Sequence, residues 1–331
     1  MTLKRTLQII VVLVGLAVIS VFHFGKTPAR EKTRLERESL YCATGITTEN
    51  RDLLQNELFA IVNTFIAWRD GFPAKFAHDL PPTALLMVTW EPYLVDFDEH
   101  SLLYAIAKER EDEVICDFAD SCRAYGKPVI VRWGHEMNGN WYPWSGASVE
   151  EDSGLYISAY RRIRDIFRKR ECTNAKFVFC VNYRDVPAGK WNRFEEYYPG
   201  DEYVDFLGMD IYNWGNIGRW GWWFWSRSRW TAPEDLLEKP YERMIRLSPD
   251  KPVLLCEVGS TSSGGDKREW IQEFFGSLKT DFTAVKGFVW FDFDKETDWG
   301  ISIDTDMWET YRAMSGDEYF KTDYRGLEVF R

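Results

Sequence analysis

Glu136 is the residue whose position most strongly suggests chemistry. It follows a Gly-Lys-Pro turn and the short β-branched run Val129–Val131, a pattern typical of a strand buried on both faces. Four side chains that could contact a sugar lie close to it in the sequence: His135, Asn138, Trp141 and Trp144. Polar groups can bind the hydroxyls of a sugar, and flat aromatic rings can cover its C–H faces. An isolated glutamate is usually exposed or paired, but this combination favours a carbohydrate site over a structural carboxylate.

A second glutamate, Glu257, ends a segment of the same design. Lys251 and Pro252 precede an apolar run, and the carboxylate follows that run directly. Apolar strands that end in carboxylates are expected in a parallel α/β barrel, because the active sites of such barrels lie on the loops after the strands. Two carboxyl groups on either side of a glycosidic bond can hydrolyse it, with retention of configuration at a separation of about 5 Å and inversion at a wider one.

Other candidates lie at the ends of two further apolar segments. Glu91 ends the segment Pro82–Pro92 and competes with Glu136 for the role of acid. The segment Tyr203–Gly215 ends in three candidates: Asp210, Tyr212 and Trp214. The period of two in a strand puts these three side chains on one side, which is expected to be the interior or the mouth of the barrel.

The segment from Arg132 to Trp144 resembles the acid/base motif of glycoside hydrolase family 26. It reads Arg-x-x-His-Glu-Met-Asn-Gly-x-Trp-x-x-Trp, and the family comprises retaining endo-acting β-mannanases with related β-glucanases and β-xylanases. The resemblance implies that Glu136 is the general acid/base and that His135 binds the sugar at the cleaved bond. It also implies that Glu257, in a similar context at the end of the seventh strand, is the nucleophile.

The same resemblance assigns roles to three more residues. Tyr212 resembles the family tyrosine that hydrogen-bonds the nucleophile, and Trp290 resembles the platform under the sugar at the cleavage point. In the family the similar Thr-Trp-Glu-Pro segment does not supply the catalytic pair, so Glu91 is expected to have a structural or substrate-positioning role. Neither a metal nor another cofactor is expected.

Apolar runs alternate with amphipathic segments along the chain, which predicts an α/β fold with a single (β/α)8 TIM barrel over residues 39–331. Besides the run before Glu136, the expected strands are Ser39–Thr47, Ala60–Trp68, Pro82–Pro92, Lys176–Tyr183, Tyr203–Gly215, Lys251–Ser260 and Lys286–Asp294. The expected helices are Glu49–Leu58, Glu113–Tyr125, Leu155–Lys169, Pro233–Leu247 and Asp266–Leu278. No element is assigned to the end of the chain.

Residues 1–38 are predicted to form a signal-anchor and juxtamembrane segment. Lys4 and Arg5 precede the apolar run Leu7–Phe24, whose length suits an export signal or a short membrane anchor. No convincing small-x-small cleavage site precedes Lys26, which favours an uncleaved membrane anchor over a cleaved signal. Basic residues on both sides leave the orientation open. We expect an extracytoplasmic protein, anchored or secreted, because polymeric β-glycans are extracytoplasmic.

Composition excludes one class of partner and leaves one loop open to interpretation. A net charge of −11 makes a nucleic-acid partner unfavourable. Aromatic residues make up 16% of the chain, more than core packing usually requires, and many lie in the Trp- and Arg-rich loop Gly215–Trp230. This loop could supply further sugar platforms, a membrane-interface contact or a packed lid with arginines stacked on rings. Its arginines could also bind an acidic polysaccharide.

The six cysteines have no spacing typical of a metal site: Cys42, Cys116, Cys122, Cys172, Cys180 and Cys256. Cys172 and Cys180 could form a disulfide between a helix end and the following strand in an oxidising compartment. Buried free thiols are the default for this number of cysteines in a domain of this size.

These observations predict a retaining endo-acting glycoside hydrolase that cleaves a β-linked polysaccharide of β-mannan or β-glucan type by double displacement. The alternative is a membrane-anchored glycan-binding or transglycosylating subunit of an exopolysaccharide system. Glutamates at both strand ends argue against a purely binding role. Hydrolysis and transglycosylation share one covalent intermediate, so both remain open at the level of sequence.

Overall fold

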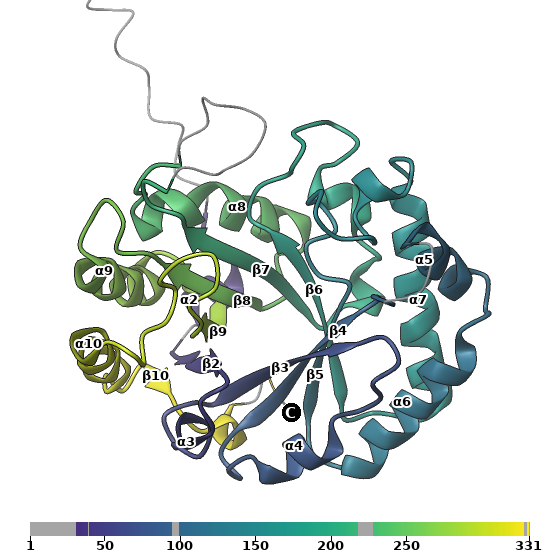
Figure 1. The fold of residues 1–331 in the computed structure, drawn as a ribbon, viewed down its shortest axis with the longest axis horizontal. Helices are drawn as coiled ribbons and strands as arrows, with labels where there is room; N and C mark the ends of the chain where they lie inside the picture. Colours follow the sequence, from purple (N-terminus) through teal and green to yellow (C-terminus); the bar gives the residue numbers. More distant parts are fainter. Residues whose placement is uncertain (1–30, 39, 95–98, 218–227, 328–329, 331) are drawn as a thin grey trace, which may run out of the picture. The chain divides into compact units, whose positions relative to one another are not determined.

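Among the residues described by the structure, a computed structural model, eight parallel strands close into a barrel (Figure 1). The first strand is split into β1 (Cys42–Ala43) and β2 (Gly45–Thr47). The others are β3 (Ile61–Ala67), β4 (Leu85–Glu91), β5 (Val129–Trp133), β6 (Ala175–Asn182), β7 (Phe206–Asn213), β8 (Val253–Ser260) and β9 (Val285–Phe291). Neighbouring strands pair in chain order, and β9 also pairs with β1 and β2, which closes the ring. The predicted TIM barrel is confirmed.

The structure describes residues 31–38, 40–94, 99–217, 228–327 and 330. Residues 34–331 form one compact unit. The apolar run Leu7–Phe24 and most of the Trp- and Arg-rich loop, residues 218–227, lie outside the described residues. Within the described part of the chain, no helix is long and apolar enough to cross a membrane.

Helices surround the barrel (Figure 1). The described helices are α2 (Arg34–Arg37), α3 (Arg51–Leu54), α4 (Ala74–Asp79), α5 (Glu99–Ala107), α6 (Asp112–Tyr125), α7 (Ser153–Lys169), α8 (Pro233–Leu247), α9 (Lys267–Thr280) and α10 (Thr305–Ser315). Short 3-10 turns occur at Gly146–Ser148, Phe194–Tyr197, Asp201–Tyr203 and Tyr324–Gly326, and the short strand β10 (Phe320–Lys321) pairs with β1. The helices α6 to α9 match their predicted ranges closely. The helix predicted over residues 49–58 is reduced to α3.

Helix α7 shows how the outer layer positions the candidate motif. Asp152 caps its start by accepting a hydrogen bond from the backbone N–H of Leu155 at 3.2 Å. Tyr156 and Tyr160, one helical turn apart, are buried on the same face and contact the ring of Trp133, with centroids 5.4 and 5.9 Å away. The end of β5, which leads into Glu136, is therefore held against α7.

Helix α2 belongs to the compact unit, although it lies within the predicted signal-anchor and juxtamembrane segment, residues 1–38. Its Glu36 is buried and accepts a hydrogen bond from the Tyr241 hydroxyl at 2.9 Å. The backbone carbonyl of Glu36 accepts another from Thr283 at 2.8 Å. These contacts attach α2 to the helical layer and to the chain just before β9.

The end of the chain, left unassigned at the level of sequence, closes the amino-terminal end of the barrel. Tyr324, Leu327 and Phe330 pack against the side chains inside the barrel. The ring of Phe330 lies 5.6 Å from that of Phe206, and Tyr324 N–H donates to the carbonyl of Thr83, just before β4. The opposite, carboxyl end of the barrel is left for a binding site.

The possible disulfide between Cys172 and Cys180 is not present, and all six cysteines are free in the structure, in line with the default expectation of free thiols. The alternation of side chains along β6 points Cys180 into the barrel, where it packs with Val178. Cys172 lies before β6 and packs in the outer core between strands and helices. The two thiols thus face different cores.

Candidate active site

A cleft of about 1090 Å³ lies at the carboxyl ends of the strands. Residues at the ends of five strands line it: Phe65, Glu91, Tyr212, Glu257 and Phe291. Glu136, Trp141 and Trp214 line it as well. The structure therefore brings both glutamates of the predicted pair into one cleft, at the end of the barrel where active sites of this fold lie.

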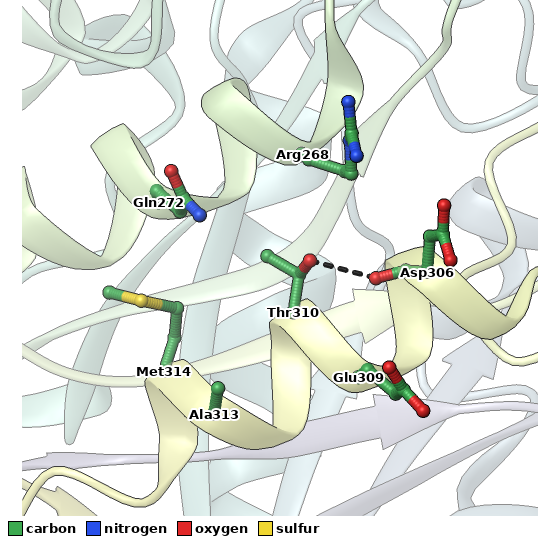
Figure 2. Close-up of a pocket in the computed structure, with 7 residues that line it drawn as sticks. All are labelled: Arg268, Gln272, Asp306, Glu309, Thr310, Ala313 and Met314. Atoms are coloured by element: carbon green, nitrogen blue, oxygen red, sulfur yellow. Dashed lines mark hydrogen bonds between the residues drawn. The ribbon is translucent and has the colours of Figure 1, made fainter.

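A smaller hollow of about 340 Å³ lies on the outside of the molecule (Figure 2). Arg268 and Gln272 of α9 lie on one side of it, and residues 306–314 of α10 lie on the other. The Thr310 hydroxyl donates to the backbone carbonyl of Asp306 at 2.7 Å, a bond within α10. This hollow lies between helices rather than at the strand ends, so we assign the chemistry to the cleft.

Glu257 points into the cleft because β8 carries an irregularity. The register with β7 pairs Met209 with Leu255 and then Asp210 with Glu257, so Cys256 has no partner. Cys256 packs inside the barrel, and strict alternation would turn Glu257 outward. A bulge of this kind re-aims a side chain, and here it leaves Glu257 only 8% exposed within the cleft.

Two donors hold the Glu257 carboxylate. Arg132 Nη1 donates to Oε1 at 2.6 Å, and the Tyr212 hydroxyl donates to Oε2. Arg132 also pairs with Asp210 through Nη2. Burial alone lowers the pKa of Arg132, but the charges of Asp210 and Glu257, among others, outweigh it and hold this pKa above its ordinary value. The cation and the hydroxyl suit a carboxylate that reacts in its charged form.

Arg132 is itself fixed by polar side chains that line the barrel interior. Its Nη1 donates to Thr89 at 3.1 Å, Thr89 donates to the Asn63 carbonyl oxygen at 2.8 Å, and the Asn63 amide donates to Thr47 at 3.0 Å. These residues come from β5, β4, β3 and β2, and all are buried. A hydrogen-bonded chain across four strands leaves the guanidinium little freedom to move.

Glu136 is held differently, by the loop after β5. Its backbone has a φ of 54°, in the left-handed region, which costs a residue other than glycine about 1 kcal/mol. The backbone N–H donates to the Cys180 carbonyl at 3.0 Å, and the carbonyl accepts from Gly139 N–H at 2.8 Å. These bonds maintain a turn that directs the side chain to the cleft.

Trp141 contacts the Glu136 carboxylate and the cleft at the same time. Its Nε1 donates to Glu136 Oε2 at 2.8 Å, while 41% of the residue is exposed. A Cβ on Gly139 would lie 2.6 Å from the Trp141 ring, so glycine is required for this placement. Trp141 thus offers an exposed aromatic face beside the carboxylate, a placement that suits a sugar platform.

His135 lies behind the cleft rather than in it. It is fully buried, and its Nε2 is 3.0 Å from the hydroxyl of Tyr142, which lines the cleft. Burial, with a contribution from Arg132, lowers the pKa of His135 well below its ordinary value. The imidazole is therefore neutral and supports Tyr142, instead of offering a nitrogen to the cleft as the prediction required.

Three more predicted sugar-binding residues are also buried outside the cleft. Asn138 Oδ1 accepts from Asn182 N–H at 2.9 Å, which ties the motif to the end of β6. Trp144 stacks on Tyr142 at 4.3 Å and donates to the His135 carbonyl at 2.6 Å. All three serve to position the loop or the barrel: Asn138, Trp144 and Trp290.

The expected platform, Trp290, points outward because of its place in β9. It is fully buried in the outer core, where its ring lies 6.1 Å from that of Trp270 on α9. The neighbouring Phe291 lines the cleft instead, together with Trp299. Trp299 lies 4.9 Å from Tyr212 and 4.8 Å from Trp214, measured between ring centroids. In the sequence, the available signal for Trp299 was its position in the loop after the last strand, where residues of the cleft are expected.

Glu91 is a further carboxyl group of the cleft, besides the candidate pair. Burial raises its pKa above the ordinary value, and the negative charge of Glu257 adds to this effect, while Arg132 and Lys295 oppose it. Its place at the end of β4, in the lining of the cleft, suits a substrate-positioning role.

One group of side chains beneath the cleft has donors suited to a metal. Cys180, Asp210 and Cys256 are buried, and their ligand atoms lie within 4.8 Å of one another. Arg132 already pairs with Asp210, and the Cys180 thiol lies 3.2 Å from the other oxygen of that carboxylate. The guanidinium thus supplies the positive charge that the Asp210 carboxylate requires.

Comparison with known proteins agrees with this geometry. The profile of the family described as Glycosyl hydrolase family 26 matches residues 107–225, which include the Glu136 motif and Tyr212. Endoglucanase H of Acetivibrio thermocellus is 35% identical over 268 residues, covering 80% of this chain and 28% of that protein. The chain belongs to glycoside hydrolase family 26.

Other similar proteins extend the family assignment. A protein of Caldalkalibacillus mannanilyticus named mannan endo-1,4-beta-mannosidase A and B is 30% identical over 155 residues, 45% of this chain and 25% of that protein. The family 26 chain thus spans roughly a quarter of the length of these two relatives. In fold it resembles a family 26 β-mannanase of Bacteroides ovatus, with a TM-score of 0.63 and 12% identity over 90% of this chain and 95% of that one.

Proposed function

We propose that this family 26 chain is a retaining endo-acting glycoside hydrolase with Glu257 as nucleophile and Glu136 as general acid/base. The observation that carries this proposal is the pairing of two differently held carboxylates in one cleft. Glu257 accepts from a cation and a hydroxyl, whereas Glu136 lies beside an exposed tryptophan on a loop. The first arrangement favours an anion that attacks, and the second places the other carboxylate beside an exposed ring that a sugar can cover.

The reaction follows from these positions. A Glu257 oxygen attacks the anomeric carbon while Glu136 gives its proton to the departing glycosidic oxygen, so a glycosyl ester forms and the polymer is cut. Glu136 then removes a proton from water, whose oxygen attacks the anomeric carbon from the side that the leaving group vacated. Glu257 departs as a carboxylate, and two inversions give net retention.

Arg132 and Tyr212 support this cycle without taking part in proton transfer. Their hydrogen bonds orient the two Glu257 oxygens and stabilise the carboxylate before attack and after release. His135 is neutral and fixes the hydroxyl of Tyr142 at the wall of the cleft. Glu91, whose pKa is raised chiefly by burial, can donate as well as accept a hydrogen bond to a sugar hydroxyl when it is protonated.

The substrate we propose is a neutral β-glucan, with β-mannan as the second choice. The similar protein that matches 80% of this chain is named an endoglucanase, whereas the mannosidase of Caldalkalibacillus mannanilyticus matches 45%. The described lining of the cleft also carries more acidic than basic side chains. The acidic ones are Glu49, Glu91, Glu136, Glu257, Asp294 and Glu296, and the basic ones are Arg184, Arg229 and Lys295. This balance disfavours an acidic polysaccharide.

A polysaccharide panel tests the proposal. The full chain is incubated with mixed-linkage β-glucan, β-mannan, β-xylan and an acidic polysaccharide, and reducing ends and product lengths are measured. We expect oligosaccharides from β-glucan, and the Glu257→Ala variant should lose several powers of ten in rate, because the step that it removes has no substitute. Activity retained in Glu257→Ala, or cleavage of the acidic polymer alone, contradicts the proposal.

We also propose an extracytoplasmic location with a membrane anchor at Leu7–Phe24. The supporting observations are the apolar run itself and the polymeric nature of the substrates named for similar proteins. Fractionation of cells that express the full chain or a chain without residues 1–35 tests this. Loss of membrane association on deletion is expected, and recovery of a shortened soluble form of the full chain shows a cleaved signal instead.

A further inference from the structure

Lys267 is a buried lysine at the start of α9, behind the lining of the cleft. Its ammonium donates to the backbone carbonyls of three consecutive residues: Asp298 at 2.5 Å, Trp299 at 3.1 Å and Gly300 at 2.7 Å. A lysine ammonium has three donors and no acceptor, so these bonds satisfy it completely. Only 2% of the residue is exposed, and a charge at such a site is costly unless it is hydrogen-bonded. The geometry therefore couples the ammonium to this one turn.

The turn formed by residues 298–300 depends on a cation. Its three carbonyls converge on one nitrogen, and dipoles in this arrangement repel one another unless a positive charge lies between them. Burial lowers the pKa of Lys267 to about 8. Four aspartates of the loop between β9 and α10 oppose this lowering of the pKa: Asp298, Asp294, Asp292 and Asp304. At neutral pH the side chain is thus an ammonium with all three donors.

The turn carries Trp299, whose side chain lines the cleft. The ring packs on the end of β8, where a Cβ on Gly259 would lie 3.2 Å from the ring of Trp299 and 2.8 Å from that of Tyr212. Gly259 and Glu257 belong to the same strand. The backbone of Trp299 is therefore held by Lys267, while its ring lies beside the strand that carries the candidate nucleophile.

Other bonds tie the same turn to the barrel. The Trp299 carbonyl also accepts from Trp290 Nε1 at 3.0 Å. The Asp298 carboxylate accepts from the Thr261 hydroxyl and from Ser262 N–H, in the loop that leads from β8 to α9. Each of these partners contacts one residue of the turn, whereas Lys267 contacts all three. Loss of the lysine should accordingly disturb the turn most.

We propose that Lys267 is a positioning residue for carbohydrate binding, which fixes the turn at residues 298–300 so that the ring of Trp299 covers a sugar beside Glu257. This inference rests on the proposed function, because it takes the cleft as a glycan site. An aromatic ring covers the sugar in the bound substrate and in the transition state alike. Interactions of equal strength in the two states affect KM rather than kcat.

A second buried lysine, Lys286, provides a matched control. It is 5% exposed and lies at the start of β9, at the amino-terminal end of the barrel. Its ammonium donates to the backbone carbonyls of Thr283 at 3.2 Å and Leu35 at 3.5 Å. Both lysines thus hold backbone carbonyls, but Lys286 does so at the end of the barrel opposite the cleft.

The first test compares Lys267→Met and Lys286→Met with the wild type as full-length proteins. KM and kcat are measured on the polysaccharide that the wild type cleaves fastest. We expect Lys267→Met to raise KM roughly tenfold with kcat within about twofold of the wild type. Lys286→Met should lower Tm and leave KM unchanged. An unchanged KM in Lys267→Met, or an equal rise in Lys286→Met, overturns the proposal.

A double-mutant cycle with Trp299→Ala separates positioning from a general loss of structure. If Lys267 acts through Trp299, the double variant Lys267→Met/Trp299→Ala should have the same KM as Trp299→Ala alone. Additive effects of the two changes would contradict the proposed role. If Lys267→Met fails to fold, Lys267→Gln takes its place in the cycle. Its amide keeps two donors, so the rise in KM should be smaller.

Hydrogen exchange distinguishes a failure of this inference from a failure of the proposed function, because it needs no substrate. The backbone N–H groups of residues 299–302 are hydrogen-bonded within the loop. They should exchange faster in Lys267→Met and at the wild-type rate in Lys286→Met. Unchanged exchange in Lys267→Met overturns the inference even when the enzyme is active. A wild type that cleaves none of the polysaccharides refutes the proposed function instead.

Discussion

The two carboxylates of the candidate pair are supported by different kinds of structure. Glu257 stands on a barrel strand and is held by Arg132 and Tyr212, whose side chains come from β5 and β7. Glu136 lies on a loop with a left-handed backbone, and a tryptophan from the same loop contacts its carboxylate. One carboxylate is fixed by the barrel itself, and the other is fixed by a turn that follows a strand.

This difference corresponds to what each group must do. A nucleophile attacks one carbon from one direction in its charged form, so a rigid support with a cation favours it. A general acid/base gives a proton to a sugar oxygen and later takes one from water, so it must stay accessible to both. If the comparison is right, loss of Arg132 alters both the barrel and the rate, whereas loss of the side chain that contacts the Glu136 carboxylate alters the rate alone.

The largest effect is expected for Arg132→Met. This change leaves Asp210 buried without its cation, and it removes a donor from Glu257. Loss of one partner of a buried ion pair typically costs about 3–5 kcal/mol, so the free energy of unfolding measured in urea should fall by that amount. Arg162→Met is the control, because Arg162 pairs with Asp112 at a partly exposed site, where ion pairs are worth about 0–1 kcal/mol. Equal costs for the two variants count against the account.

Tyr212→Phe tests the second donor to Glu257. The hydroxyl is removed while the ring contacts with Trp214 and Trp299 remain. Removal of one hydrogen bond to a charged group in an active site is expected to lower kcat by about 10²-fold with little change in Tm. Tyr198→Phe removes a hydroxyl bonded to Asp201 outside the cleft and should leave kcat unchanged. A Tyr212→Phe enzyme with full activity contradicts the proposed role.

Variants of Trp141 and Trp144 test the wall of the cleft separately from the packing behind it. Trp141→Phe removes the donor to Glu136 but keeps an aromatic ring, so kcat should fall by roughly tenfold without a change in Tm, as expected for one lost hydrogen bond. Trp144→Phe removes a buried bond to the His135 carbonyl and part of the stacking on Tyr142. The Tm of that variant should fall by a few degrees. The reverse pattern would mean that Trp144, rather than Trp141, forms the wall of the cleft.

The smallest effect concerns the pH dependence of stability at His135. Its pKa is lowered in the folded protein by burial and by Arg132, while the unfolded value is about 6.5. The unfolded chain therefore binds a proton first as the pH falls below about 6.5, and stability is lost by up to about 1.4 kcal/mol per pH unit. Urea unfolding at pH 7 and pH 5.5 should show a smaller loss in His135→Gln than in the wild type. An identical loss shows that another group carries the dependence.

Much of this organisation could be read from the sequence. Both glutamates end apolar runs, and strands with this ending place their side chains at one end of a parallel barrel, where the structure has them. Tyr212 could be predicted as well, since it shares a strand face with Asp210. Where a strand is regular, the alternation of its side chains is sufficient to predict which residues face the cleft.

Other parts depend on three-dimensional contacts that no local pattern encodes. The Cys256 bulge changes which residue of β8 faces inward, and the register of β9 turns Trp290 away from the cleft. His135, next to Glu136, is covered by its own loop once Tyr142 and Trp144 fold over it. Arg132 was visible as the first residue of the motif, but its partners lie on distant strands.

The central claim is that Glu257 forms the covalent bond and that Glu136 serves it as acid and base. The most direct test uses Glu136→Ala with an activated aryl β-glycoside, whose leaving group needs little help from an acid. The account predicts that a glycosyl ester on the peptide containing Glu257 accumulates, and that azide, which needs no base, restores turnover and gives a glycosyl azide of retained configuration. A glycosyl azide of retained configuration from Glu257→Ala, with an inverted glycosyl azide and no ester in Glu136→Ala, would show that the two roles are exchanged.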